Sequence, residues 1–197
     1  MRRRAAAEEL ELSKADSLTR MDWTIAATAA LGNAGIDGVR VEALARQLKT
    51  SKGSFYWHFR DRADLLDAIL TLWEDEGMEQ VIAMAAHLAS PAERLHAVLE
   101  EAVRFDVHGA SVSAVEGALR AWAAQDDAAG MRVRAVDARR VDYLRDELLQ
   151  LGHGQEMAQR RAEALYLALL GYYAAHRYAS PSANVETLTT LLRLAIG

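Results

Sequence analysis

The sequence predicts an all-α protein, and three observations support this fold class. Only 2 of the 197 residues are proline and 12 are glycine, while 51% are hydrophobic, which favours long uninterrupted helices. Apolar residues recur at helical spacing, as in Val41, Leu44, Ala45 and Leu48, which fall at positions i, i+3, i+4 and i+7. Capping residues and glycine or proline breaks separate the periodic stretches. We therefore expect about nine helices.

A pair of short helices at 41–48 and 52–58 forms the most informative local pattern. Ser51 is suited to cap the second helix, because its hydroxyl can accept a hydrogen bond from an unpaired N–H of the first turn. Lys52 places a cation at the positive end of the helix dipole, which is unfavourable unless an anion such as a DNA phosphate lies outside. Two helices joined by a tight turn form a helix-turn-helix, whose second helix enters the major groove by its N-terminal end.

One longer helix precedes this pair and six follow it. The preceding helix covers residues 19–34 and stops at Gly35, a residue type favoured just past helix ends. Ser90 to Glu93 form a capping box with proline at the first helical position. Glycine and proline breaks separate the last three helices. The six following helices are expected at 62–88, 91–107, 112–124, 128–151, 155–178 and 182–196.

Charge is distributed unevenly along the chain. The net charge of −5 by itself argues against a nucleic-acid partner. Residues 1–62, however, hold 11 Lys/Arg and 8 Asp/Glu, whereas residues 63–197 hold 12 and 20. The basic part is therefore the part that carries the helix-turn-helix. The chain has no cysteine, which excludes disulfides, thiol nucleophiles and Cys-ligated zinc.

An ordered set of motif residues runs through 19–66, namely Trp23, Ala26-Ala27, Leu31, Gly35, Leu44-Ala45, residues 51–59, Arg62 and Leu65-Leu66. In this order and spacing, the set resembles the DNA-binding domain of the TetR family of bacterial transcriptional regulators. The usual family pattern has an Ala-Ala pair and a closing Gly in the first helix and a second helix ending in Ile/Leu-Ala. Ser-Lys-Gly-Thr/Ser-Leu/Phe-Tyr-x-x-Phe and Lys/Arg-x-x-Leu-Leu then follow. Arg40 and Lys49-Thr50 depart from the usual cap and turn residues.

The resemblance implies a division into a mobile basic arm at 1–15, a three-helix helix-turn-helix DNA-binding domain at 16–62, and a helical ligand-binding and dimerisation domain at 63–197. A basic run such as Arg2–Arg4 in this arm is more often a solvated tail than a segment that binds a DNA groove. Phe55 and Phe59 are expected in the core, whereas three aromatic side chains in a row at 56–58 cannot all face inward. Arg62 either contacts a phosphate, as the resemblance implies, or pairs with a neighbouring aspartate. The expected DNA contacts are Arg40, Thr50, Ser51, Lys52, Gly53, Ser54, Tyr56, Trp57, His58 and Arg62.

No sequence pattern supports catalysis, so no enzyme activity, cofactor or metal is expected. The histidines of the second half lack metal-site spacing, and no nucleophile elbow or phosphate-binding loop occurs. The resemblance implies an inducer cavity in the larger domain. Aromatic residues there can line the cavity or can be ordinary core. The expected ligand contacts are Phe105, His108, Trp122, Tyr143 and Tyr166.

The two C-terminal helices carry apolar stripes that one domain does not easily cover. A twofold dimer that pairs them as a four-helix bundle would bury both stripes, as the resemblance also implies. The alternative is that these helices are buried wholly within their own subunit. The expected dimer contacts are Leu165, Leu169, Tyr172, Leu188 and Leu192.

The sequence as a whole predicts a sequence-specific DNA-binding regulator, namely a homodimeric repressor that a small apolar or amphipathic ligand releases from a double-stranded operator. The chain shows no apolar run of membrane-spanning length and no secretory signal, so we expect a cytoplasmic protein without a membrane partner. Two alternatives stay open: a regulator without a small-molecule inducer, acting as an activator or answering to a protein, and an all-α enzyme.

Overall fold

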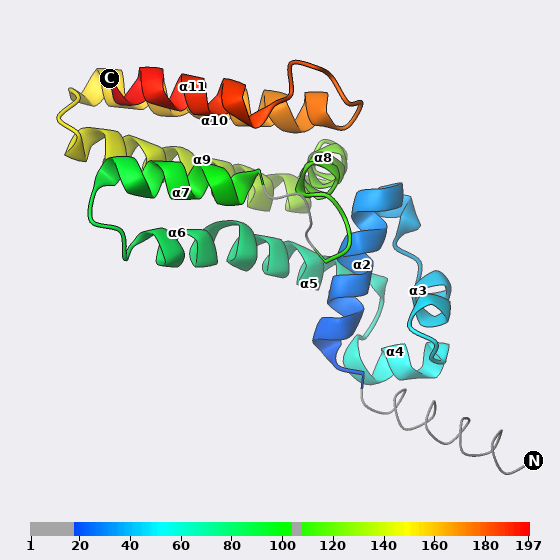
Figure 1. The fold of residues 1–197 in the computed structure, drawn as a ribbon. Helices are drawn as coiled ribbons and strands as arrows, with labels where there is room; N and C mark the ends of the chain where they lie inside the picture. The colour runs from blue at the N-terminus through cyan, green and yellow to red at the C-terminus, as the bar shows by residue number, and fades with distance from the viewer. Residues whose placement is uncertain (1–17, 104–107) are drawn as a thin grey trace, which may run out of the picture.

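The computed structural model describes residues 18–103 and 108–197. The expected arm at 1–15 and the expected ligand contact Phe105 lie outside these described residues. Counting α5, η2 and α6 as one continuous helix, the described part of the chain holds nine α-helices, as the sequence predicts. Helices α2, α3 and α4 form a head at one end of the molecule, and the remaining helices form a body (Figure 1).

The head is built from the three predicted helices. Helix α2 (Arg20–Ala34) begins with a capping box, in which the hydroxyl of Thr19 accepts a hydrogen bond from the backbone N–H of Asp22. A 3-10 turn, η1 (Ile36–Gly38), leads to α3 (Val41–Gln47). Helix α4 (Lys52–His58) is capped by Ser51, as predicted. The helix-turn-helix is therefore α3, the turn at 48–51, and α4.

The body begins with the helix that leaves the head. Helix α5 (Arg62–Glu74) continues through the π-helical turn η2 (Asp75–Glu79) into α6 (Gln80–Ala85). The capping box at Ser90 opens α7 (Pro91–Ala102), and the part of its predicted range at 104–107 lies outside the described residues. The other body helices follow the predicted ranges closely: α8 (Val112–Ala123), α9 (Asp127–Gln150), α10 (Gln155–His176) and α11 (Val185–Ile196).

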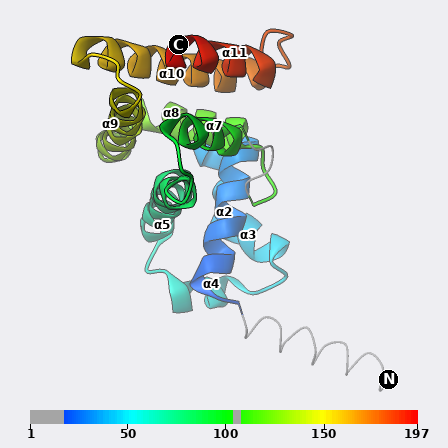
Figure 2. The same cartoon turned by 60° about the vertical axis from the view of Figure 1, so that its left-hand side comes forward.

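The body helices are layered, and α10 and α11 form the layer farthest from α3 and α4 (Figures 1 and 2). Helix α9 lies beneath α10, and α7 lies between α9 and α6. None of the helices in the described ranges combines the length and the apolar character that crossing a bilayer requires.

The largest apolar core runs from the head into the body. Trp23, Leu44 and Phe55 of the head belong to the same cluster of buried side chains as Leu119 of α8 and Val136 of α9. Two smaller clusters hold α7, α9, α10 and α11 together. The head is therefore packed directly on the body through apolar contacts.

Gly32 permits the close packing of α2 against α8. A Cβ atom at this position would lie 3.0 Å from the Cβ of Ala110 and 3.0 Å from Cγ2 of Val115. Any larger side chain would therefore push the head away from the segment that begins α8.

Candidate DNA-binding surface and ligand cavity

The recognition helix α4 is held by aromatic packing on its inner face. Phe55 and Phe59 are fully buried, and the ring of Trp23 meets that of Phe55 edge to face at 5.3 Å between centroids. This confirms that both phenylalanines belong to the core. The inner face fixes the orientation of α4, so that its opposite face is presented to solvent.

The outer face of α4 displays the side chains expected to contact DNA. Tyr56 and Trp57 are 56% and 87% exposed, and His58 is half-buried. Ser51, Lys52 and Gly53 are exposed at the N-terminus of α4, with Ser54 and Thr50 half-buried beside them. Arg40 is exposed at the start of α3. These residues are exposed or half-buried in the helix-turn-helix and next to it, and their contact with DNA stays a prediction.

Lys52 forms an ion pair with Glu42 across the helix-turn-helix. Its Nζ lies 2.5 Å from Oε1 of Glu42, and both side chains are exposed. The hydrogen bond with the Glu42 carboxylate raises the pKa of Lys52, and the same bond lowers the pKa of Glu42. Lys52 therefore stays cationic at neutral pH, but an approaching phosphate must compete with Glu42 for it.

Arg62 has a structural use that the sequence did not reveal. Its Nε donates to the backbone carbonyl of Val39 at 2.6 Å, and its Nη2 donates to that of Ile36 at 2.5 Å. It is paired with neither neighbouring aspartate in these contacts. The guanidinium thus anchors the link between η1 and α3, which leaves fewer of its donors for a phosphate.

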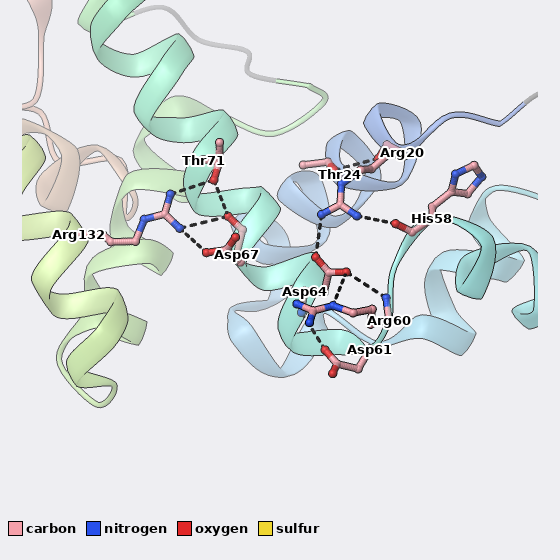
Figure 3. Close-up of polar contacts among 9 residues, drawn as sticks. All are labelled: Arg20, Thr24, His58, Arg60, Asp61, Asp64, Asp67, Thr71 and Arg132. Carbon is pink, nitrogen blue, oxygen red and sulfur yellow. Dashed lines mark hydrogen bonds and ion pairs between the residues drawn. The ribbon is translucent and has the colours of Figure 1, made fainter.

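Asp64 joins three parts of the head (Figure 3). Its carboxylate accepts a hydrogen bond from Nη2 of Arg20 at 2.8 Å and one from the backbone N–H of Arg60 at 3.0 Å. Nη1 of Arg20 also donates to the carbonyl of His58, the last residue of α4, and its guanidinium lies 4.1 Å from the centre of the Phe59 ring. The Asp64 contacts therefore tie the end of the recognition helix to the starts of α2 and α5.

These contacts make the stability of the head depend on pH. The hydrogen bond from Arg20, followed by that from the Arg60 backbone, lowers the pKa of Asp64 from 3.8 to about 2. A carboxylate with a lowered pKa in the folded state stabilises fully above its ordinary value, and this contribution is lost as pH falls through the folded pKa. Asp64→Asn should therefore lower the melting temperature at pH 7, and the gap from the parent protein should close between about pH 4 and pH 2.

Thermal unfolding measured across this pH range checks the expectation. In an Arg20→Gln background the same Asp64 substitution should cost less, because the main partner has gone. A gap that is constant from pH 7 to pH 2 would contradict the role of the Asp64 carboxylate.

A cavity of about 550 Å³ lies in the body and reaches the head. Its walls come from α5, η2 and α6, from α7, α8, α9 and α10, and from Thr28 of the head helix α2. Most of its lining is apolar, with side chains such as Leu72, Val98, Val115 and Leu169. A mostly apolar cavity with few polar groups is the usual form of a small-molecule site.

A buried ionic network forms one wall of this cavity. The Glu116 carboxylate accepts hydrogen bonds from Nε1 of Trp73 at 3.0 Å and from Nη2 of Arg140 at 3.1 Å, and it also pairs with Arg120. Burial alone would raise the pKa of Glu116, but the charges of Arg140 and Arg120 outweigh it, so the pKa is lowered. Glu116 is therefore an ionised carboxylate that joins α5, α8 and α9 beside the cavity.

The same network extends to α10. Nη2 of Arg120 donates to Oδ1 of Asp137 at 3.0 Å and to the hydroxyl of Tyr166 at 2.9 Å. Tyr166 in turn donates its hydroxyl proton to Asp137, and burial is the main cause that raises the pKa of Tyr166 to about 12. Two carboxylates and two guanidiniums thus balance one another within the wall.

Three of the five expected ligand contacts line the cavity, namely His108, Tyr143 and Tyr166. Trp122 does not line it, because its side chain packs on the largest apolar core. The tryptophan of the cavity wall is Trp73 of α5. Contact of any of these residues with a ligand stays a prediction.

Helix α9 is also linked to α5 by the hydrogen bonds of one arginine side chain (Figure 3). Arg132 of α9 donates to Asp67 at 2.6 Å, to Thr71 at 2.9 Å and to Glu74 at 2.7 Å. The guanidinium therefore follows two turns of the helix that connects the head with the cavity. A shift of α9 is in this way tied to a shift of α5.

The C-terminal helices present a different face to solvent from the one expected in the dimer. Tyr172, Leu188 and Leu192 are buried within the chain's own core, and Leu165 and Leu169 are half-buried there. They pack against α7 and α9, which cover this face of α10 and α11. Within the described part of these helices, the exposed apolar stripe is instead formed by Ala164, Leu167, Gly171, Ala174, Leu191 and Leu194.

The described residues contain no group of three or more His, Cys, Asp or Glu side chains that could hold a metal ion.

Residues 25–69 match the family model described as bacterial regulatory proteins of the tetR family. This range covers α3, α4 and most of α2 and α5, which is the part that carries the candidate DNA-binding surface. A comparison with curated protein sequences finds no match.

Solved structures with the same fold extend over nearly the whole chain. A transcriptional regulator from Rhodococcus sp. Rha1 is 20% identical, covers 91% of this chain and 95% of its own, and gives a TM-score of 0.73. A regulator from Saccharomonospora viridis, solved in complex with choline, is 17% identical over 90% and 94%, with a TM-score of 0.76. A TetR-family regulator from Agrobacterium tumefaciens is 18% identical over 94% and 97%, with a TM-score of 0.70. At these identities the likeness concerns the fold.

Proposed function

We propose that the chain is a DNA-binding transcriptional regulator of the TetR type rather than an enzyme, and that it is a homodimeric repressor that leaves its operator when a small molecule fills the body cavity; the family model at residues 25–69 and the shared fold support this. The protein acts in the cytoplasm, where its operator lies. The observation that carries the proposal is the cavity, because Thr28 of the head and Trp73 of α5 both line it.

A ligand in this cavity can bias the position of the head. It would touch α2 directly and would touch α5 through Trp73, while Glu116 and Arg132 tie α5 to α8 and α9. Two heads of a dimer fit one B-DNA operator only when their recognition helices are about 34–36 Å apart. A ligand that prefers another spacing weakens DNA binding by its difference in affinity for the two states. The choline-bound Saccharomonospora viridis regulator shows that this fold can hold a small molecule.

The proposed dimer joins the exposed stripes of α10 and α11. We propose this stripe in place of the contacts expected from the sequence, because Tyr172, Leu188 and Leu192 are already buried in their own subunit and have little surface left to bury against a partner. Leu167 and Leu194 are 67% and 70% exposed, so both side chains have much apolar surface to gain from burial. The small residues Ala164, Gly171 and Ala174 between them allow the helices of two subunits to approach closely.

The proposal is tested by footprinting the protein on the DNA upstream of its own gene. A protected site with two half-sites related by twofold symmetry supports a dimeric operator-binding protein. Small molecules that raise the melting temperature are then added to the complex. Loss of the footprint supports the repressor mechanism, whereas a stabilising molecule that leaves the footprint intact contradicts it.

Lys52 and Glu42 provide a matched pair of variants for the DNA surface. Lys52→Ala should weaken specific and non-specific binding together and reduce the slope of log K against log salt by about 1 per half-site, because one phosphate contact is lost. Glu42→Gln should strengthen both, since it releases Lys52 from its ion pair and removes an acidic group from the DNA-facing side. Fluorescence-anisotropy titrations at several salt concentrations measure both effects. Unchanged salt slopes in both variants would show that Lys52 does not touch the DNA backbone.

A further inference from the structure

Lys49 lies in the turn of the helix-turn-helix and has a left-handed backbone conformation, with a φ of 54°. The turn closes α3 as a Schellman motif: the N–H of Lys49 donates to the carbonyl of Arg46 at 3.2 Å, and the N–H of Thr50 donates to that of Ala45 at 2.9 Å. Glycine is the usual residue at the left-handed position of this motif, because a Cβ atom there lies too close to the following carbonyl oxygen. The lysine side chain therefore lowers the stability of its own turn.

The ammonium group of Lys49 forms no ion pair and no hydrogen bond with the part of the chain that the structure describes, and the residue is exposed. Two of the cations expected to contact DNA are, by contrast, engaged within the subunit. Lys52 pairs with Glu42, and the guanidinium of Arg62 donates to two backbone carbonyls. The charge of Lys49 is thus available to a partner outside the chain.

Ala179, just beyond the end of α10, shows what this backbone conformation means by itself. Its φ is 55°, and the N–H groups of Ala179 and Ser180 donate to the carbonyls of His176 and Ala175 in the same pattern. A left-handed residue other than glycine therefore also occurs where there is no charge to offer a ligand. What distinguishes Lys49 is a long cationic side chain without a partner, placed between the two helices of the candidate DNA-binding surface.

We propose, on the basis of the DNA-binding function proposed above, that Lys49 binds a phosphate group of the operator backbone from the turn between α3 and α4. Lys49 stands two residues before Ser51, which caps α4, so their Cα atoms are at most about 7.6 Å apart. A recognition helix that enters the major groove by its N-terminal end brings this turn to the edge of the groove, where the phosphates run. A lysine ammonium group binds a phosphate as a point charge and reads no base sequence.

The substitution Lys49→Gly sets stability against DNA affinity at this one position. The variant removes the Cβ atom from a left-handed residue, so its melting temperature should stay unchanged or rise by up to about 4 °C. Affinity for DNA should fall by about 5-fold or more per half-site near 0.1 M salt, and the slope of log K against log salt should become shallower by about 1 per half-site. A lysine that is only a solvated side chain predicts no change in either DNA measurement.

The measurements use the full-length protein and two fluorescein-labelled duplexes of about 30 base pairs, which is long enough for two half-sites one helical turn apart. One duplex carries the footprinted site upstream of the protein's own gene, and the other has a random sequence. Anisotropy titrations at several salt concentrations should show the loss on both duplexes, because a phosphate contact carries no sequence information. A loss confined to the footprinted site would overturn the proposal, since it would indicate a contact with a base edge.

Three further variants separate the charge of Lys49 from its backbone conformation. Lys49→Gln keeps the Cβ atom but removes the charge, so it should lose as much affinity as Lys49→Gly without any gain in stability. Lys49→Arg keeps both and should bind DNA like the parent protein. Ala179→Gly should match the stability change of Lys49→Gly and leave DNA binding unchanged. Parental affinity and salt slope in Lys49→Gln, or an equal loss in Lys49→Arg, overturns the assignment of Lys49.

These outcomes are distinguishable from a failure of the proposed function. If the parent protein binds its footprinted site and all Lys49 variants bind it equally well, the chain remains a DNA-binding regulator and only the role of Lys49 falls. If the parent protein gives no footprint and binds neither kind of duplex, the proposed function falls together with this contact.

Discussion

Placing a glutamate at Leu167 or Leu194 should convert the proposed dimer into monomers and reduce operator affinity by about 10²–10⁴-fold, because the second half-site contact is then no longer intramolecular. Both side chains are exposed in the single chain, so the subunit itself should keep its melting temperature within a few degrees. Each charge would be buried without a partner only in the dimer, which costs several kcal/mol per subunit. Light scattering and operator titration measure the two consequences.

Met131→Glu is the matched control, since Met131 is 61% exposed on α9 outside the exposed stripe. It should leave the mass and the operator affinity unchanged. By contrast, Leu188→Glu would bury its charge inside the subunit and would report on folding instead of assembly. Dimers that persist at low micromolar concentration in both the Leu167 and the Leu194 variants would show that this stripe is not the interface.

Glu116→Gln should be the most destabilising single substitution in the cavity wall, at about 3–5 kcal/mol, because it leaves Arg140 buried without its counter-charge. The carboxamide also presents N–H groups that cannot accept from Trp73 or from the guanidiniums. Urea unfolding of the parent and variant proteins gives the difference in free energy of unfolding.

Glu156→Gln is the appropriate comparison. Glu156 pairs with Arg160 one turn along α10, and both side chains are largely exposed. An exposed pair of this kind contributes about 0.5 kcal/mol or less. Equal effects of the two substitutions would mean that the Glu116 network is as well hydrated as the surface.

The helix boundaries were predictable because they depend on local chemistry. Ser51, Ser90 and the glycine at position 35 act within one turn of their own positions, so spacing and residue type suffice to place the helix ends. The inward face of α4 was predictable for a similar reason: Phe55 and Phe59 are four positions apart and share one side of the helix.

The solvent-facing side of α10 was not predictable because this helix is apolar on several sides. Leu165 and Leu169 form one stripe, and Ala164, Leu167 and Gly171 form another. Periodicity identifies both stripes but cannot say which of them α7 and α9 cover. That choice is made by tertiary packing, which placed Tyr172 inside the subunit and left Leu167 outside.

The polar contacts were the least predictable part of the candidate site. The sequence allowed Arg62 a phosphate or a neighbouring aspartate, but its partners in the structure are the carbonyls of Ile36 and Val39, which any residue could supply. The π-helical turn at 75–79 was likewise not predictable, because nothing in the apolar periodicity of the sequence marks it. Its backbone brings Gly77 against Arg140, where a Cβ atom would lie 2.8 Å from Nη2.

The continuity of the main core limits how modular this regulator can be. Trp23, Phe55 and Leu119 share one buried cluster, so the reading head has no separate interior of its own. Grafting this head onto another regulator's body would replace the surface that completes its core, starting where Gly32 touches Ala110 and Val115. Changes of operator preference are therefore obtained more easily by substituting exposed residues of α4 than by exchanging whole heads. Because α2 and α8 share this core, a larger side chain on one helix requires a smaller side chain on the other as the sequence diverges.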